Sequence, residues 1–286
     1  MKLEKTHNIL IVGLGLLGGS YAKALKKQGF TVNAITRSQK SIDYALENEI
    51  IDAGAAQVDE LLLQKADVIV FALYPHVFVE WIREHGHLLR EGTILTDVTG
   101  VKSGLVEQIQ SMLKPGVEFI AAHPMAGREV YGVENSDDGI FKGANYIVVP
   151  TDKNTFGAIE LCQDLGRILG FADVSVLTPE RHDEMIAFLS QLTHCIAVAL
   201  MCANDAANLE RYTGDSFRDL TRIANINDEM WSELFLANRS ALLGVMDGYR
   251  ATFDRLYNCI KNEDREEMRS MMRLSTERRR QFNKKV

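Results

Sequence analysis

The stretch NILIVGLGLLGGS, residues 8–20, places a short apolar strand directly before the pattern Gly13-x-Gly15-x-x-Gly18. In a βαβ unit, the first glycine permits a tight turn, the second lets the backbone approach a pyrophosphate, and the third lets the helix pack on the strand. The N–H groups at the start of that helix then face the phosphate charge. The stretch therefore predicts a dinucleotide-binding fold, with loop contacts from Gly13, Leu14, Gly15, Leu16, Leu17 and Gly18.

The residues after the second expected strand bear on which dinucleotide is bound. An NAD-binding fold usually has an acidic residue about 20 residues beyond the glycines, where it binds the ribose hydroxyls. The corresponding stretch here holds Thr36, Arg37 and Ser38, and an arginine with two hydroxyls can hold a 2′-phosphate. An arginine can also lie flat on the adenine of NAD, so both cofactors stay open and NADP is favoured. Two further expected cofactor contacts, Leu73 and Pro75, lie at the end of the strand pattern 67–73 and just after it.

The composition of the 286-residue chain is that of an ordinary soluble protein, with 46% hydrophobic and 25% charged residues. The net charge of −7 leaves no basic surface of the kind that nucleic-acid binding needs. No uninterrupted apolar run approaches the roughly 20 residues of a membrane span, and the start of the chain lacks the layout of a signal peptide. We therefore expect a cytoplasmic protein with no nucleic-acid or membrane partner.

Glycine and proline mark a domain boundary near Thr178. Of the 21 glycines, 18 lie before this point, and all five prolines lie at or before Pro179. Apolar runs that alternate with helical patterns before the boundary predict a Rossmann-type, mostly parallel sheet domain over 1–177. Beyond it, we expect an all-helical domain over 178–286, with helices from Pro179 to about Asn204, from about Asp228 to Ile260, and from about Asp264 onward. The first helix is apolar on every face in its middle and must be covered all round, which predicts a homodimer through the helical domain.

Two of the seven histidines, His123 and His194, are candidates for a site. His123, in FIAAHPMAG, follows a predicted strand at the carboxyl edge of the sheet, where ligands of open α/β folds bind. The alternative is a histidine that caps a loop. His182 and His194 lie twelve residues apart on the first long helix, about 120° apart around a regular helix, and so do not serve one pocket as a simple pair. His194 contacts either the core or a buried ligand. No histidine pair has zinc-site spacing, so no metal is expected.

Six ordered motifs resemble those of the prephenate dehydrogenase family over Ile9 to about Asn238. They are GLGLLGGS, DVTGVK, HPMAGRE, the pair His182-Asp183, SQLTH, and FRDLTRIA followed by Met230-Trp231. The resemblance implies a nucleotide-binding domain, a helical dimerisation domain, and oxidative decarboxylation of the small anion prephenate to 4-hydroxyphenylpyruvate with hydride transfer to NAD(P)⁺, on the route to tyrosine. It leaves open arogenate as the substrate.

The resemblance also implies roles for individual residues. His123 is the catalytic residue that accepts the hydrogen bond of the ring hydroxyl. Arg222 clamps the side-chain carboxylate; the alternative is a structural ion pair with Asp219 across a helical turn. The other implied substrate-site residues are His194, Glu129 at the entrance, Asp219 beside Arg222, and Trp231, which in the family can reach the site from the partner subunit.

Two positions depart from the family pattern. Many members have a serine where this chain has Gly100, and it stays open whether the neighbouring Thr99 replaces its hydroxyl; both are retained as substrate-site residues. Arg128 stands where many members have a small hydroxyl residue, and its positive charge would either favour a neutral His123 or assist an anionic substrate. A β-hydroxyacid dehydrogenase or imine reductase is disfavoured because the long helix carries no lysine. A nucleotide-binding sensor without activity is supported only by the missing serine.

Overall fold

The structure is a computed structural model that describes residues 2–128 and 130–282. Contacts within the chain divide it into two compact units, Met1–Asn238 and Arg239–Val286. The first unit contains the sheets, the glycine loop and the first helices of the expected helical domain. Each unit is described separately below.

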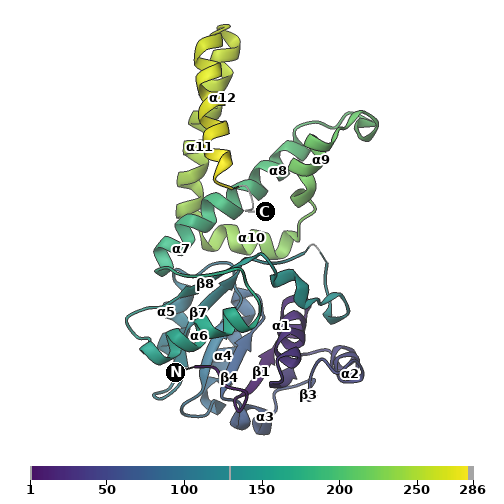
Figure 1. Cartoon of the computed structure of the whole chain (residues 1–286), viewed down its shortest axis with the longest axis vertical. Helices are drawn as coiled ribbons and strands as arrows, with labels where there is room; N and C mark the ends of the chain where they lie inside the picture. The colour runs from purple at the N-terminus through teal and green to yellow at the C-terminus, as the bar shows by residue number, and fades with distance from the viewer. Residues whose placement is uncertain (1, 129, 283–286) are drawn as a thin grey trace. The chain divides into compact units, whose positions relative to one another are not determined.

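A six-stranded parallel sheet forms the centre of the first unit (Figure 1). Its order is β3-β2-β1-β4-β5-β6, and the strands span Asn8–Val12 (β1), Thr31–Ile35 (β2), Ala53–Ala55 (β3), Val68–Phe71 (β4), Ile94–Asp97 (β5) and Glu118–Phe119 (β6). The order reverses between β1 and β4, and ligands of open α/β folds bind outside the carboxyl ends of the strands at this point. The predicted Rossmann-type fold is confirmed, and the glycine loop follows β1 directly.

Apolar residues on both faces of each strand explain why helices cover the sheet on both sides. Along β1, Ile9 and Ile11 belong to one buried cluster, whereas Leu10 and Val12 belong to the other, as the period of two in a strand requires. The first cluster takes side chains from α1 (Leu16–Lys27), α2 (Gln39–Glu47) and α6 (Phe156–Ile168). The second takes side chains from α3 (Glu60–Lys65), α4 (Pro75–His85) and α5 (Leu105–Met112).

A second sheet of three strands continues from the edge of the first. Its strands are β7 (Ala121–Pro124), β8 (Asn145–Val149) and β9 (Asp173–Val176), with β7 antiparallel and β9 parallel to β8. The single strand expected over 118–122 is therefore two short strands, and the chain changes sheet at Ile120, whose N–H still donates to Leu95 of β5 at 2.9 Å. His123 lies inside β7, opposite Ile147, rather than after a strand.

The helical part of the first unit begins at the expected residue. Thr178 caps α7 (Pro179–Ile186) by accepting the N–H of Arg181, and proline occupies the first turn. A π-helical segment, Ala187–Gln191, separates α7 from α8 (Leu192–Cys202). The chain continues through α9 (Asp215–Thr221), a 3₁₀ turn at Arg222–Ala224, and α10 (Asp228–Ala237).

The helix Pro179–Cys202 is apolar and long. By length and composition alone it could cross a membrane, a test that core helices of soluble proteins also pass. Only 28% of its most apolar window is buried within this one chain. Its apolar middle is thus only partly covered by the residues that the structure describes.

The second unit consists of two helices, α11 (Arg239–Lys261) and α12 (Arg265–Arg280), which pack against each other. The one helix expected from about Asp228 to Ile260 is in fact α10 and α11, separated at Asn238. The buried side-chain amide of Asn238 donates to the backbone carbonyl of Asp183 at 2.9 Å and to Oε1 of Gln191 at 2.8 Å. These tertiary hydrogen bonds hold the break.

Candidate active site

A cavity of about 570 Å³ lies where the glycine loop, the ends of β4 and β5, strand β7 and the helical part of the first unit meet. Most of the residues predicted for cofactor and substrate line it together. They are Gly15, Leu16, Leu17, Gly18, Leu73, Pro75, Thr99, Gly100, His123, His194, Arg222 and Trp231. Residues from opposite ends of the sequence therefore form one site.

The other predicted residues do not line this cavity. They are Gly13, Leu14, Thr36, Arg37, Ser38 and Asp219. Gly13 and Leu14 are buried under the loop, and Asp219 lies on α9, exposed to solvent. Glu129 lies outside the described residues.

The glycine loop is packed so closely that two of its glycines have no room for a side chain. Gly13 has φ +98°, and a Cβ on it would lie 2.4 Å from the carbonyl oxygen of Ala72. A Cβ on Gly18 would lie 2.0 Å from the carbonyl oxygen of Gly13. By contrast, a Cβ on Gly15 would meet no atom within 4 Å, and no side chain caps the start of α1 there. The loop thus presents open backbone and a helix N-terminus to the cavity, and this arrangement fits a dinucleotide phosphate.

The end of β2 is polar and basic. The Thr36 N–H donates to Ala55 of β3 at 3.1 Å, and Ser38 caps α2 by accepting the N–H of Ser41 at 3.2 Å. Arg37 lies between them and is exposed. Arg37 does not line the cavity, and it follows the strand after which a Rossmann fold usually carries the residue that binds the ribose.

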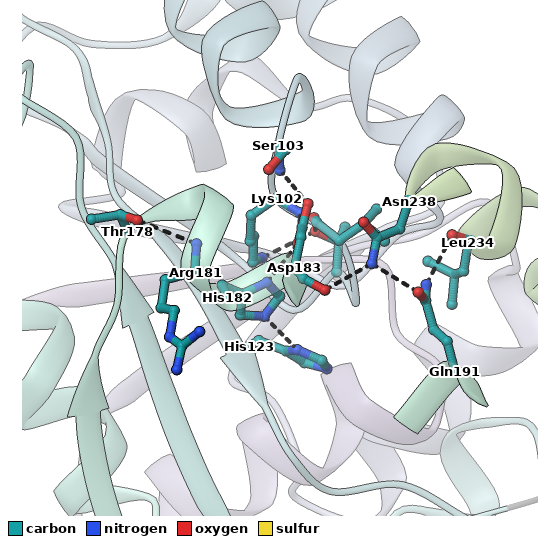
Figure 2. A network of polar contacts seen from close by, with 12 residues as sticks. Lys102, Ser103, His123, Thr178, Arg181, His182, Asp183, Gln191, Leu234 and Asn238 are labelled. Carbon is teal, nitrogen blue, oxygen red and sulfur yellow. Dashed lines mark hydrogen bonds and ion pairs between the residues drawn. The ribbon is translucent and has the colours of Figure 1, made fainter. Parts of the chain in front are cut away.

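His123 is hydrogen-bonded to a second histidine behind it, as Figure 2 shows. The Nδ1 atom of His123 lies 2.9 Å from Nε2 of His182, and Nδ1 of His182 lies 2.7 Å from Oδ1 of Asp183. Burial, the neighbouring His182 and the charge of Lys102 hold the pKa of His123 well below its ordinary value of 6.5. Burial also lowers the pKa of His182, although the hydrogen bond to Asp183 opposes that shift. Both rings are therefore neutral at pH 7.

A buried ion pair lies beneath β7. The Lys102 ammonium and the Asp97 carboxylate are both fully buried and 2.6 Å apart. Lys102 also donates to the backbone carbonyl of Ala122 at 2.6 Å and to the Thr99 hydroxyl at 3.1 Å. The Thr99 hydroxyl in turn donates to Asp97. Burial lowers the pKa of Lys102, because the charged form loses its hydration. The pair fixes the backbone next to His123.

The helical part of the first unit contributes His194, Trp231 and Arg222 to the lining of the cavity. The His194 ring stacks on the Trp231 ring of the same chain, with centroids 3.7 Å apart, and its Nδ1 lies 2.9 Å from the carbonyl oxygen of Ser190. Arg222 begins the 3₁₀ turn after α9 and is solvent-accessible. A cation and an aromatic ring thus line the same cavity as His123.

Sequence reasoning missed the residues behind His123. The sequence predicts no site role for His182, Asp183 or Lys102, although all three are buried. An adjacent His-Asp pair just after a helix start was the available signal, because burying two such polar side chains requires partners. Among residues 2–128 and 130–282, no group of three or more His, Cys, Asp or Glu side chains could hold a metal ion.

Comparison with known proteins identifies the family. Residues 21–170 match the model of the prephenate dehydrogenase nucleotide-binding domain, and residues 178–274 match that of the prephenate dehydrogenase dimerization domain. A prephenate dehydrogenase of Bacillus subtilis is 30% identical over 93% of this chain and 73% of its own length. A cyclohexadienyl dehydrogenase of Zymomonas mobilis is 27% identical over 90% of this chain and 89% of its own.

Solved structures agree. The prephenate dehydrogenase of A. aeolicus in complex with hydroxyphenyl propionate and NAD⁺ superposes with a TM-score of 0.90 at 29% identity, covering 99% of this chain and 100% of its own. The arogenate dehydrogenase of Synechocystis gives a TM-score of 0.83 at 26% identity, covering 96% and 100%. The chain therefore belongs to the prephenate dehydrogenase family.

Proposed function

We propose that this chain is an NAD(P)-dependent prephenate dehydrogenase that converts prephenate to 4-hydroxyphenylpyruvate and CO₂. The observation that supports it is the single cavity in which Gly15–Gly18, His123, His194 and Arg222 meet. When bound, the nicotinamide accepts the hydride that leaves the hydroxyl-bearing ring carbon. The glycine loop would hold the pyrophosphate against the N-terminus of α1.

His123 is the proposed proton acceptor. A neutral imidazole takes the proton of the ring hydroxyl as the C–H electron pair leaves as hydride, and a ring carbonyl forms. The C–CO₂ bond then breaks, and its electrons complete the aromatic ring as a phenolate. His123 returns its proton to that oxygen, so no proton is gained or lost overall. The low pKa of His123 keeps the acceptor nitrogen unprotonated at pH 7.

Arg222 is the proposed clamp for the side-chain carboxylate, since a guanidinium can bind a carboxylate with two parallel hydrogen bonds. His194 and Trp231 would form the adjoining wall, and Thr99 and Gly100 the floor near the reacting hydroxyl. Asp219 lies one helical turn before Arg222 in the chain and is proposed to orient it.

The test is the absorbance of reduced nicotinamide with prephenate as substrate, in wild type and in His123→Asn. The variant should lose turnover by about 10²–10⁴-fold and retain cofactor affinity. Arogenate is assayed beside prephenate, because the two differ only in the side chain, where arogenate has an amino group in place of the keto oxygen. A higher kcat/KM with arogenate would replace the proposed substrate, and full activity of His123→Asn would refute the proposed base.

NADP is the proposed preferred cofactor, because Arg37 and Ser38 follow β2 and no acidic residue stands among 36–40. The measurement is KM for each cofactor, in wild type and in Arg37→Ala. The variant should raise KM for NADP and leave KM for NAD within about twofold of wild type. An equal rise for both cofactors would instead place Arg37 against the adenine.

A homodimer through the helical residues is also proposed. The helix Pro179–Cys202 leaves Phe188, Leu189 and Met201 about half exposed in one chain, and the matched family model over 178–274 is described as a dimerization domain. A second copy would cover these residues in a cytoplasmic enzyme. Light scattering on the purified protein would give twice the chain mass; a monomer at micromolar concentration would refute this assembly.

A further inference from the structure

The hydrogen bonds that join His123, His182 and Asp183 determine which nitrogen of each ring carries a proton. The Asp183 carboxylate accepts two backbone hydrogen bonds: the N–H of Lys102 donates to Oδ1 at 2.9 Å, and the N–H of Ser103 donates to Oδ2 at 2.7 Å. Burial pushes the pKa of Asp183 upward, but its hydrogen bonds with His182 and Ser103 outweigh this and hold the pKa below 3.8. Asp183 is therefore a carboxylate at pH 7, and a carboxylate can only accept hydrogen bonds.

The proton positions in the two rings follow from this carboxylate. His182 must donate from Nδ1 to Asp183, and because its ring is neutral, its Nε2 carries no proton and accepts. The contact at 2.9 Å is then a hydrogen bond from Nδ1–H of His123 to Nε2 of His182. In neutral His123 the remaining nitrogen, Nε2, carries a lone pair, and this ring lines the cavity.

We propose that His182 and Asp183 are positioning residues that hold His123 in the tautomer with its proton on Nδ1, so that Nε2 takes the proton of the substrate hydroxyl. This inference rests on the proposed function of His123. In the opposite tautomer, Nε2–H would face the hydroxyl as a donor and could not accept its proton. The pair thus sets the direction of the proton transfer.

The same pair also balances the charge that forms during the reaction. When Nε2 of His123 takes the hydroxyl proton, an imidazolium appears near the ammonium of Lys102, and the two like charges repel. Asp97 is already paired with Lys102 at 2.6 Å, so Asp183, 3% exposed, is the carboxylate left to oppose the new charge through His182. The Nδ1 proton of His123 can shift to His182 and back without any bond to the substrate changing. Among the described residues, the other arginine and histidine side chains that line this cavity are those of Arg128, Arg222 and His194.

Variants at His182 separate positioning from simple packing. His182→Leu removes the acceptor and should lower kcat by about 10²-fold or more, with KM for prephenate and cofactor within about threefold. His182→Gln places an amide oxygen near the former Nε2 and should restore kcat to within about tenfold of wild type. The matched control is Arg181→Gln on the same helical turn, where the exposed guanidinium pairs with Glu184; this variant should leave kcat unchanged.

Nitrogen NMR of the histidine rings reads the tautomer directly and does not depend on a variant folding. The wild type should show His123 protonated on Nδ1, and Asp183→Asn should shift the population toward Nε2. A wild-type His123 protonated on Nε2, or a His182→Leu enzyme with wild-type kcat, would overturn the inference. If His123→Asn is inactive in either of these cases, the proposed function stands and only the role of His182 and Asp183 is lost.

Discussion

Replacing Lys102 by Met tests whether the buried ion pair beneath β7 stabilises the fold. The substitution keeps most of the volume and removes the ammonium, which leaves the carboxylate of Asp97 buried and uncompensated. Two backbone N–H groups, of Thr99 and Ala122, still donate to Asp97 at 3.0 Å each, but the backbone carbonyl of Ala122 loses the hydrogen bond that the Lys102 ammonium donates at 2.6 Å. Breaking a buried pair by removing one partner costs about 3–5 kcal/mol.

The double variant Asp97→Asn/Lys102→Met sharpens this prediction. Both variants lose the hydrogen bond to the Ala122 carbonyl; the double variant no longer buries a charge, but the amide leaves one backbone N–H without an acceptor, at about 1–3 kcal/mol. The double variant should therefore be more stable than Lys102→Met by about 2 kcal/mol. Chemical unfolding followed by far-UV circular dichroism gives each free energy of unfolding.

The control is Lys27→Met, which breaks an exposed pair with Asp138 and should cost at most about 1 kcal/mol. A Lys102→Met variant no less stable than Lys27→Met, or a double variant less stable than Lys102→Met, would show that an uncompensated charge on Asp97 does not destabilise the fold. Because domain stabilities are about 5–15 kcal/mol in total, the single variant should also show a visibly lower melting temperature.

Three further outcomes are expected. The pKa values of His123 and His182 lie below 6.5 in the folded chain, so the unfolded chain binds more protons below that pH. The free energy of unfolding should therefore be highest above about pH 6.5 and fall as the pH drops, by at most about 1.4 kcal/mol per pH unit for each ring. Unfolding curves measured across this pH range should show a shallower fall for His182→Gln than for wild type. Gly18→Ala should lower both the melting temperature and cofactor affinity, whereas Gly15→Ala, whose Cβ meets no atom within 4 Å, should weaken only cofactor binding in titrations; a normal affinity for Gly15→Ala would contradict the assigned loop contact. Gly100→Ser should keep the melting temperature, because a Cβ there lies 3.5 Å from its nearest atom, and a new hydrogen bond of about 0.5–1.5 kcal/mol to the substrate would raise kcat/KM about 2- to 10-fold; a fall in kcat/KM would mean that the hydroxyl has no place beside His123.

Local sequence was sufficient for the glycine loop and the sheet, because the pattern of residues 8–20 depends on contacts between near neighbours in one βαβ unit. The split between β6 and β7 was not predictable in the same way. The run from Glu118 to Ala122 is uniformly suited to a strand, and only its two different partners, β5 and β8, divide it.

The polar network behind His123 depends on contacts distant in sequence. His123 and His182 are 59 residues apart, and Lys102 and Asp183 are 81 apart, so no window of sequence contains either pair. The break at Asn238 has the same cause, since its amide is held by Asp183 and Gln191. Residue types indicated which side chains could belong to a site, but only the tertiary structure shows which of them are in contact.

The π-helical segment Ala187–Gln191 has a consequence for how this helix tolerates length changes. A π turn holds about one residue more than an α turn, and one residue corresponds to a rotation of about 100° in a regular helix. Deleting a single residue from this segment would let α7 run into α8 as an uninterrupted α-helix. Because the π turn absorbs the surplus residue, the side chains of α8, His194 among them, would keep their direction relative to His182 after this deletion. A regular α-helix over the undeleted residues would instead turn α8 by about 100°. The π turn, and not only the number of residues between them, thus sets the register between the two histidines.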